Sequence, residues 1–245
     1  MSTEARNPKS VGLDKMSAQE IVRLMNEDDR SVLRALQSAE APLAQAADRA
    51  AKAFQEGGRI IYLGAGTSGR IAVMDAAEMP PTFGIDPDRF VAVFAGGVGA
   101  QKKASEKAED DDHEAIQALN KLKLTSADVV IGVAASGRTP FVIAGLKHAS
   151  QKGVWTCALA NNPGAPIFDV VDLPILLDTG PEILTGSTRL KAGTSQKLAL
   201  NRISTIAMVM SGKVIENLMV DVKASNDKLK ERCVRIVREL STVSD

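Results

Sequence analysis

The feature that most constrains the fold of this chain is a series of five short apolar runs, mostly separated by longer segments with helical periodicity. Nearly continuous apolar strands that alternate with helices are typical of a parallel β-sheet with helices on both of its faces. The sequence therefore predicts an α/β fold with a doubly wound, mostly parallel sheet. The predicted strands cover residues 59–63, 90–95, 128–134, 154–160 and 173–177.

Two helices are predicted before the first strand. The first begins near Ser17, because Ser17 and Glu20 form a capping-box pattern ahead of apolar residues at helical spacing. The second is rich in alanine and covers residues 29–56. Its predicted inward-facing side chains are Leu33, Leu36, Ala44 and Ala47.

Further helices are predicted from the chain that follows the first strand. One begins near Gly69 and ends at Pro80-Pro81, because proline disfavours helical backbone in the residue before it. A long helix is predicted over residues 189–220, with Ile215 on its buried side, and a last helix over about 225–240.

The chain is predicted to form one domain with a short arm at its start. Residues 1–15 are polar and are interrupted by Pro8 and Gly12, which is typical of an extended arm. The remaining residues, 16–245, are of a suitable length for a single domain with flanking helices.

Composition excludes several classes of protein. Lys and Arg together number 30, as do Asp and Glu, and aromatic residues make up 3% of the chain. A chain without net charge and with few aromatic side chains lacks the usual contacts to nucleic acid. No apolar run is long enough for a membrane span and no signal peptide precedes Glu4, so we expect a cytoplasmic protein without membrane contacts. Two Cys and two His are too few for a disulfide framework and argue against a zinc site.

The loop after the first predicted strand matches the dinucleotide fingerprint Gly-x-Gly-x-x-Gly at residues 64–69. That fingerprint also needs an acidic residue at the end of the next strand, where it holds the ribose. The next predicted strand ends in Ala95-Gly96-Gly97 instead. The sequence therefore disfavours a nicotinamide or flavin cofactor at this loop.

The loop after the third predicted strand is better suited to a phosphate group. Ser136 and Thr139 supply hydroxyl donors, Gly137 allows close approach of the backbone, and Pro140 fits the first turn of the following helix. A third polar segment, 180–195, precedes and begins the long helix and contains more hydroxyl and charged side chains than a plain helix start requires. We interpret it as the other wall of a polar sugar site.

Together these loops resemble the sugar isomerase (SIS) domain, a doubly wound fold that binds phosphosugars. The resemblance extends over nearly the whole chain to one family, the N-acetylmuramic acid 6-phosphate etherases, and the 180–194 segment is its most specific part. Met79 departs from that family, which usually has Cys there, and members commonly continue with a further helical region. The matching segments are residues 3–8, 64–70, 75–84, 108–110, 135–140 and 180–194.

The resemblance implies a lyase that cleaves the D-lactyl ether of N-acetylmuramic acid 6-phosphate with net addition of water. The products are N-acetylglucosamine 6-phosphate and D-lactate, formed during recycling of the bacterial cell wall. It also implies a homodimer that works with neither a metal ion nor an organic cofactor. The predicted substrate-binding residues are Gly66, Thr67, Ser68, Ser136, Gly137, Arg138, Thr139, Glu182, Ser187, Thr188 and Lys191.

The implied reaction needs two carboxyl groups in opposite protonation states. The aldehyde of the open-chain sugar acidifies the hydrogen on C2, so an ionised group removes that proton and a protonated group then protonates the departing lactate oxygen. Glu78 and Glu109 match the pair of the family. We expect Glu78 to be the acid, partly buried near the strand-end cleft, and Glu109 to be the base, with the reverse assignment left open. Residues 109–114 are also an acidic run of the kind that is commonly exposed to solvent.

Two other functions on the same fold are left open by the sequence. One is a non-enzymatic phosphosugar sensor like the glucokinase regulatory proteins, and the other is an aldose–ketose isomerase. The presence of both Glu78 and Glu109 favours an enzyme, because a sensor needs no acid–base pair. Isomerisation is chemically close, since it also removes the proton on C2.

Overall fold

The computed structural model describes residues 1–97, 99, 106–222, 224 and 227–241. Its centre is a sheet of five parallel strands in the order β2-β1-β3-β4-β5, which confirms the predicted doubly wound α/β fold. All five strands lie within or overlap the predicted runs. Their bounds are β1 Ile60–Gly64, β2 Phe90–Phe94, β3 Val129–Val133, β4 Trp155–Ala160 and β5 Leu173–Leu176.

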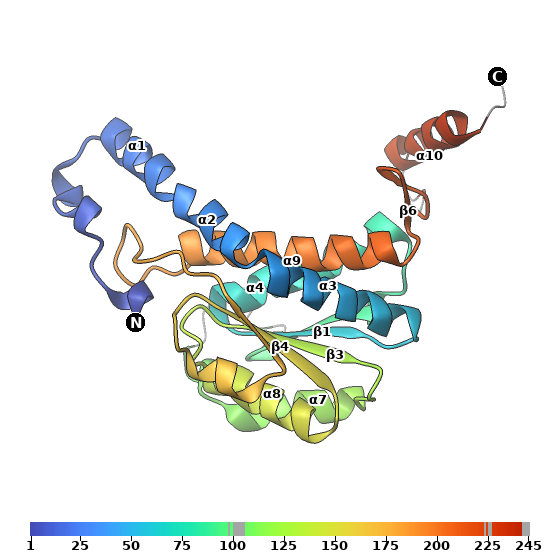
Figure 1. Ribbon diagram of the computed structural model, residues 1–245, viewed down its shortest axis with the longest axis horizontal. Helices are drawn as coiled ribbons and strands as arrows, with labels where there is room; N and C mark the ends of the chain where they lie inside the picture. Colours follow the sequence, from blue (N-terminus) through green and yellow to red (C-terminus); the bar gives the residue numbers. More distant parts are fainter. Residues whose placement is uncertain (98, 100–105, 223, 225–226, 242–245) are drawn as a thin grey trace.

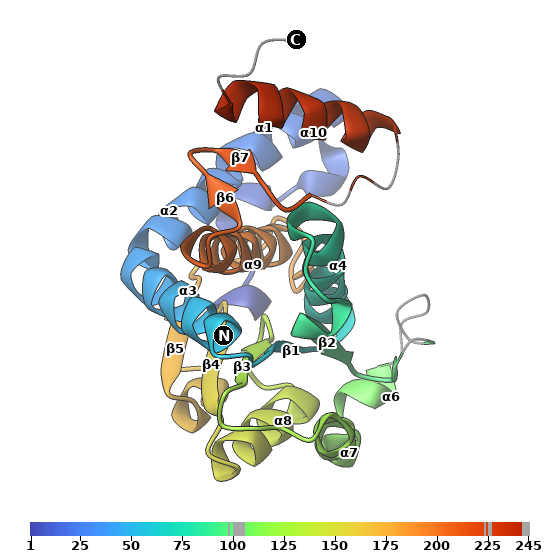
Figure 2. The ribbon, with the colours of Figure 1, turned by 90° about the vertical axis from the view of Figure 1, so that its right-hand side faces the viewer.

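Helices cover both faces of the sheet (Figure 1). Successive side chains of a strand point to opposite faces, so Ile60 and Tyr62 of β1 pack in one apolar cluster and Ile61 and Leu63 in the other. The first cluster includes side chains of the three helices above the sheet, and the second those of the two helices below it (Figure 2). The upper helices are α3 Glu40–Gln55, α4 Gly66–Phe83 and α9 Lys191–Met210, and the lower ones are α7 Asp112–Leu122 and α8 Pro140–Gln151.

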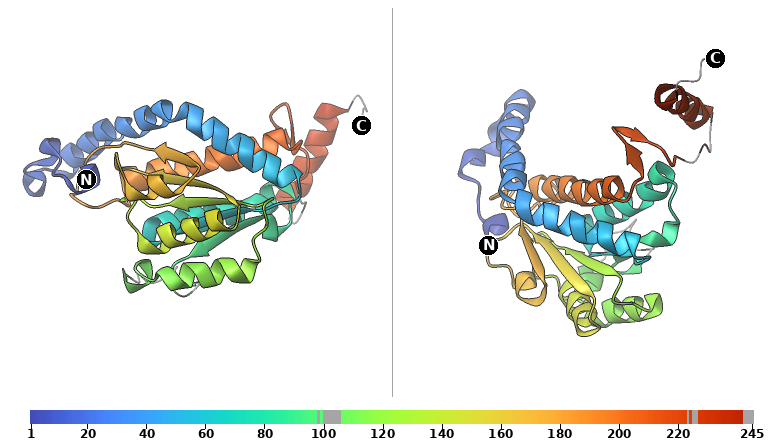
Figure 3. Two further views of the ribbon diagram at one scale, coloured as in Figure 1. Left: turned by 60° about the horizontal axis from the view of Figure 1, so that its bottom comes forward. Right: turned by 45° about the vertical axis from the view of Figure 1, so that its right-hand side comes forward.

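Further elements extend from the two ends of α9. At one end lie α1, Ala18–Asp28, and α2, Arg30–Ser38, and at the other lie the hairpin β6–β7 and α10, Asp227–Leu240 (Figures 1 and 3). The hairpin strands are β6 Val214–Ile215 and β7 Leu218–Met219, and the short helix α6 covers Glu106–Glu109. Short 3-10 turns cover Ser2–Glu4, Pro8–Ser10 and Leu13–Lys15 in the N-terminal arm, and Pro87–Arg89 and Pro166–Val170 elsewhere.

The N-terminal helices differ in part from the prediction. The capping box at Ser17 is present, because its hydroxyl accepts from the Glu20 amide and the Glu20 carboxylate accepts from the Ser17 amide. The helix predicted over 29–56 is two helices that meet at Ala39, whose backbone leaves helical geometry. This bend changes which side chains face the core.

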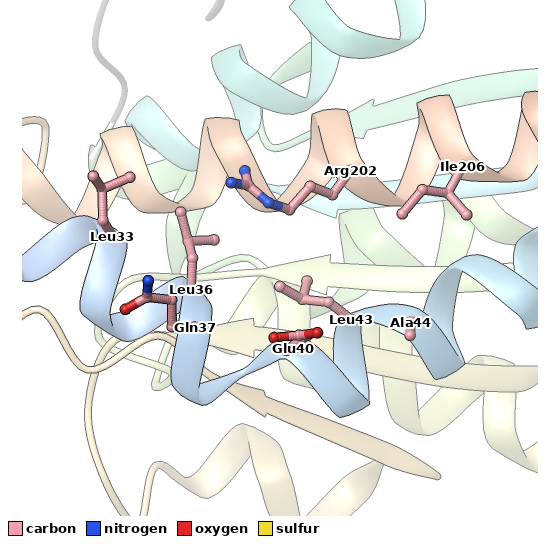
Figure 4. Close-up of a pocket in the computed structure, with 8 residues that line it drawn as sticks. All are labelled: Leu33, Leu36, Gln37, Glu40, Leu43, Ala44, Arg202 and Ile206. Carbon is pink, nitrogen blue, oxygen red and sulfur yellow. The ribbon is translucent and has the colours of Figure 1, made fainter. Parts of the chain in front are cut away.

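The prediction that Leu33 and Ala44 face inward is therefore wrong. Leu33 is 57% exposed and Ala44 is also exposed, whereas Leu36 and Ala47 are buried as predicted. Leu33 and Ala44 instead line a groove of about 500 Å³ between α2–α3 and α9, with Arg202 and Ile206 on its other side (Figure 4).

Two helix ends also differ from the prediction. Helix α4 continues through Pro80 and Pro81 to Phe83, because its last turn is closed by the Gly84 amide, which donates to the Pro80 carbonyl. Helix α9 ends at Met210, where Gly212 takes a left-handed conformation, rather than at residue 220. Ile215 is therefore a strand residue and is 49% exposed.

Candidate active site

The candidate site lies where the chain reverses its direction of winding across the sheet. Strands β1 and β3 are neighbours, but β1 connects to β2 on one side and β3 to β4 on the other. In this strand order the carboxyl ends of the two central strands border a crevice in which ligands bind. Helix α4 begins directly after β1, and α8 begins a short loop after β3. At neither helix does the N-cap side chain bond to the first backbone N–H groups, and the start of a helix is where such groups attract an anion.

The loop after β3 is shaped by Gly137, which has a φ of +66°. A Cβ at this position would lie 2.4 Å from the Cβ of Ala165, so only glycine fits. The hydroxyl of Ser136 accepts a hydrogen bond from the Arg138 amide at 3.2 Å. Ser136 and Thr139 are half-buried and Arg138 is exposed, which leaves these polar groups within reach of a ligand in the crevice.

The loop after β1 lies against Glu109. Gly66 has a φ of +53°, and a Cβ built on it would lie 2.7 Å from Oε1 of Glu109. The carboxylate of Glu109, at the end of α6, therefore lies directly over the first residue of α4. Thr67 is half-buried beside Gly66 and Ser68 is buried, whereas the guanidinium of Arg70 lies over the Phe94 ring at 5.7 Å.

Glu78 lies on the same helix but far from Gly66. It is exposed, so the expectation of a partly buried carboxyl near the strand-end cleft is wrong. Twelve residues of α-helix separate it from Gly66, which corresponds to about 18 Å along the axis. Glu78 lines a separate groove of about 580 Å³ between α4, α9 and the β6–β7 hairpin.

Beneath Glu78, a buried polar network joins α4 to α9. The Asp75 carboxylate accepts hydrogen bonds from the Tyr62 hydroxyl at 2.9 Å, the Asn201 amide at 2.6 Å and the Ser204 hydroxyl at 3.2 Å. Burial raises the pKa of the Asp75 carboxyl, and the three hydrogen bonds oppose that rise. The network fixes the helix face on which Glu78 stands, since Asp75 and Glu78 are three residues apart.

Two of the predicted binding residues, in the 180–190 loop and at the start of α9, make hydrogen bonds and an ion pair within the protein. Glu182 is fully buried and its carboxylate accepts from the backbone amides of Lys191 and Ala192, at 3.1 and 2.9 Å. Burial raises the pKa of the Glu182 carboxyl, although these hydrogen bonds oppose the rise. The Lys191 ammonium is 2.6 Å from the Asp28 carboxylate. These contacts favour a structural role for Glu182 and Lys191, and their direct contact with substrate stays a prediction.

Ser187 and Thr188 in this loop are half-buried and lie near the glycine loop. A Cβ built on Gly193 would lie 3.4 Å from both the Thr188 carbonyl oxygen and the Thr67 methyl group. The loops after β1 and before α9 therefore lie next to each other.

The N-terminal arm packs against the carboxyl ends of the strands of its own chain. Thr3 is fully buried, and its backbone amide donates to the side-chain oxygen of Asn162 at 3.1 Å. The Asn162 amide in turn donates to the Ala135 carbonyl at 3.0 Å, next to Ser136. Asn162 and its neighbour Asn161 were missed by the sequence analysis, although two consecutive amides directly after the β4 strand are a signal that could have been used.

Within the described part of the chain, neither a membrane-spanning helix nor a cluster of metal ligands is present. No helix there is both long enough and apolar enough to cross a membrane. No group of three or more His, Cys, Asp or Glu side chains there is arranged to hold a metal ion.

Comparison with known families places two overlapping domain matches on the chain. The N-terminal SIS domain of glucokinase regulatory protein matches residues 42–150, and the SIS domain matches residues 109–205. Among solved structures, a phosphoheptose isomerase from Francisella tularensis has a TM-score of 0.61 at 16% identity, over 78% of this chain and 98% of that one. The phosphoheptose isomerase from Neisseria gonorrhoeae has a TM-score of 0.58 at 23% identity, over 79% of this chain and 98% of that one. At these identities the likeness concerns the fold.

Curated proteins are similar over almost the entire sequence. A protein from Halalkalibacterium halodurans is 51% identical over 99% of this chain and 82% of its own length. One from Serratia proteamaculans is 54% identical over 97% of this chain and 80% of its own length. One from a Geobacillus species is 49% identical over 100% of this chain and 83% of its own length. All three are named N-acetylmuramic acid 6-phosphate etherase.

Proposed function

The chain belongs to the N-acetylmuramic acid 6-phosphate etherase family of carbon–oxygen lyases, and from this premise we propose how its own residues perform the reaction. We propose that it cleaves the D-lactyl ether of N-acetylmuramic acid 6-phosphate by elimination of D-lactate and addition of water to C3 of the unsaturated aldehyde, which gives N-acetylglucosamine 6-phosphate, in the recycling of cell-wall amino sugars. The observation that carries this proposal is the identity of about half of all residues along nearly the whole chain.

The phosphate group is proposed to bind at the loop after β3. Ser136 and Thr139 supply hydroxyls, and the uncapped start of α8 supplies backbone N–H groups with the positive end of the helix dipole. The exposed side chain of Arg138 adds a positive charge at the rim. The half-buried hydroxyls of Ser187 and Thr188 are proposed to bind sugar oxygens across the crevice.

Glu109 is proposed to be the base that removes the C2 proton. Its carboxylate lies over Gly66, at the crevice between β1 and β3 where the sugar would be held by its phosphate. Loss of the C2 proton places negative charge on the aldehyde oxygen, and the uncapped N-terminus of α4 offers backbone N–H groups to that charge. No metal ion or organic cofactor is needed for any step of this elimination.

Glu78 is proposed to act from the second subunit of a homodimer. The C2 proton and the ether oxygen on C3 belong to adjacent carbons, so the acid and the base must each come within hydrogen-bond reach of the same small part of the sugar. In one chain Glu78 is about 18 Å along α4 from the residue that Glu109 covers. A second copy that presents its Glu78 to the crevice would remove this separation. Two exposed apolar side chains that line the groove between α2–α3 and α9, Leu33 and Ile206, support such an interface.

A cytoplasmic location is part of the proposal. A phosphorylated sugar does not cross a membrane unaided, and the two cysteines, Cys157 and Cys233, are both free thiols, as is usual in a reducing compartment. The sensor and isomerase alternatives are not favoured, because the curated relatives of this chain have the etherase name.

The direct test is release of D-lactate from N-acetylmuramic acid 6-phosphate by the purified chain. Wild type should release one D-lactate for each N-acetylglucosamine 6-phosphate formed. An isomerase would change the sugar without releasing lactate, and a sensor would bind the phosphosugar without changing it. Either of these results would refute the proposed function.

A further inference from the structure

A single buried carboxylate, that of Asp28, joins parts of the chain that are far apart in sequence. Asp28 is the last residue of α1 and is 6% exposed. Its Oδ2 lies 2.6 Å from the Lys191 ammonium and accepts a hydrogen bond from the Asn7 side-chain amide at 3.2 Å. The Lys191 and Asn7 side chains are themselves buried. The three groups therefore form one polar contact that is closed to solvent.

Each partner of Asp28 is also tied to the 180–190 loop. The Asn7 amide donates a second hydrogen bond, to the Pro181 carbonyl at 3.2 Å. The backbone amide of Lys191 donates to Glu182 at 3.1 Å. The Asp28 carboxylate thus holds the N-terminal arm, the end of α1 and both ends of the 180–190 loop in one arrangement.

The segments held in this way contribute to the proposed sugar site. The 180–190 loop contains Ser187 and Thr188, the proposed ligands of sugar oxygens. The arm places Glu4 against the same loop, where a Cβ built on Gly186 would lie 3.2 Å from a Glu4 carboxylate oxygen. A shift of the arm or of the loop would therefore displace groups at the edge of the crevice.

The geometry of Lys191 argues against its use as a direct phosphate ligand. Its side chain is 4% exposed, and its charge is neutralised by Asp28 at 2.6 Å. Removing one partner of a buried ion pair leaves an unpaired buried charge, which is strongly unfavourable. Lys191 is consequently committed to Asp28 and acts on the site through the position of the loop.

We propose that Asp28 is a positioning residue of the etherase reaction, which holds the N-terminal arm and the 180–190 loop in the arrangement that binds the sugar. This inference rests on the proposed function, because it takes the crevice to be the substrate site. It predicts that loss of the Asp28 charge weakens substrate binding more than it slows the reaction of the bound substrate.

The test is Asp28→Asn, measured by steady-state kinetics of D-lactate release and by amide hydrogen exchange. We expect KM to rise about 10- to 100-fold, as for other small displacements of substrate-positioning groups. We expect kcat to change much less, because Glu109 and Gly66 belong to other elements. Exchange should become faster in the arm and in residues 183–190 and stay unchanged in β1 and β3.

Asp128→Asn is the matched control. Asp128 is also a buried carboxylate, 1% exposed, and pairs with Arg59 at 2.7 Å. It directly precedes β3, at the amino end of the parallel sheet and therefore opposite the crevice. This variant should lose stability yet keep the KM of wild type and the slow exchange of the arm. An equal rise of KM in both variants would show a general loss of stability and overturn the proposal.

Other outcomes are equally decisive. A lower KM in Asp28→Asn would mean that Lys191, once released, binds the phosphate directly, and would overturn the proposal. If Asp28→Asn does not fold, Asn7→Ala takes its place, because Asn7→Ala removes the contact of the arm with Asp28 and leaves the ion pair with Lys191. Faster exchange in the arm of Asn7→Ala, together with a raised KM, supports the proposal. An unchanged KM of Asn7→Ala overturns it. Failure of the proposed function can be told apart from failure of this inference, because wild type itself would then release no lactate. The positioning role is still tested in that case, since unchanged hydrogen exchange in Asp28→Asn would overturn it.

Discussion

The carboxylate of Glu109 occupies the space next to Gly66 that a side chain would need. A Cβ on Gly66 would lie 2.7 Å from Oε1 of Glu109, and its left-handed φ of +53° also favours glycine. Gly66 is the first residue of α4, so its helix begins beneath the carboxylate. The middle glycine of the Gly-x-Gly-x-x-Gly segment thus makes room for a protein carboxylate instead of a dinucleotide.

The first prediction is that Gly66→Ala inactivates the enzyme while the protein still folds. The new methyl group must displace Glu109 or move the start of α4, and kcat/KM should fall about 100-fold or more, as expected when a base is misplaced. D-lactate release and thermal unfolding measure the two effects. Gly153→Ala is the matched control, because Gly153 also has a positive φ of +74° but nothing lies within 4 Å of its added Cβ. Equal activity of the two variants would contradict the proposed place of Glu109.

The second prediction concerns the phosphate. Ser136→Ala removes a hydroxyl that we propose to bond to the charged phosphate, so binding should weaken by about 1.5–3 kcal/mol. Isothermal titration with N-acetylglucosamine 6-phosphate measures this loss. Ser150→Ala, an exposed serine at the end of α8, should leave the affinity unchanged. N-acetylmuramic acid without its phosphate should bind wild type much more weakly, and comparable turnover of the two sugars would argue against a phosphate loop at Ser136.

The third prediction is a pH-dependent loss of stability in Asp128→Asn. Burial opposes ionisation of Asp128, but hydrogen bonds from Arg59 and Thr125 outweigh it and hold the pKa of that carboxyl below its ordinary value. The carboxylate therefore stabilises the fold above the unfolded pKa of about 3.9, and this contribution disappears as pH falls through the folded pKa. Near pH 7 the variant should lose about 3 kcal/mol of unfolding free energy. In urea unfolding, the difference in unfolding free energy between wild type and Asp128→Asn should be large at pH 7 and smaller at pH 3.5. An equal difference at the two pH values would refute the assignment.

The strands could be predicted from the sequence because their signal is local. A parallel strand buried on both faces needs a short run of apolar residues, and β1, β3 and β4 each have one. The break at Ala39 and the continuation of α4 through Pro80 depend instead on neighbours. The first follows the packing of α2 and α3 on α9, and the second follows the closing hydrogen bond of Gly84.

The candidate site was predictable to the extent that topology alone determines it. Loops at the carboxyl ends of the neighbouring strands β1 and β3 must lie at the same edge of the sheet, which is where Gly66 and Ser136 are found. The pairing of Asp28 with Lys191 joins distant segments and has no local signal. The exposure of Glu78 has no clear local signal either, because Glu78 follows the buried Asp75 by three residues and directly precedes the buried Met79.

The fourth prediction separates the roles of the two glutamates. If Glu78 is the acid, Glu78→Gln still allows Glu109 to remove the C2 proton, so this variant should exchange deuterium into C2 of the product sugar phosphate in heavy water. It should release almost no lactate, with a loss of about 100- to 10,000-fold. Glu109→Gln should lose exchange and release together. The reverse pattern would mean that the roles are swapped, and an exposed surface change, Glu56→Gln, should alter neither measurement.

The fifth prediction tests whether the two glutamates of one site come from different subunits. If the protein is the proposed homodimer, Glu78→Gln and Glu109→Gln should each be inactive alone. A mixed dimer has one site that takes Glu109 from the first variant and Glu78 from the second, and that site is intact. Its other site lacks both groups. Unfolding the two variants together and refolding them at equal concentration should therefore restore about a quarter of the wild-type activity, since half of the dimers are mixed and each has one working site.

The same mixture gives a different result if each chain builds its own site. Every site would then contain one Gln, and the mixture would stay as inactive as either variant alone. Wild type taken through the same refolding measures the recovery of the procedure. The mixture of Glu78→Gln with the double variant Glu78→Gln/Glu109→Gln is the matched control, because no pairing of those chains contains both carboxylates. Activity in that control would show that Glu78 is not required, and activity in the first mixture alone would place Glu78 and Glu109 of one site on separate chains.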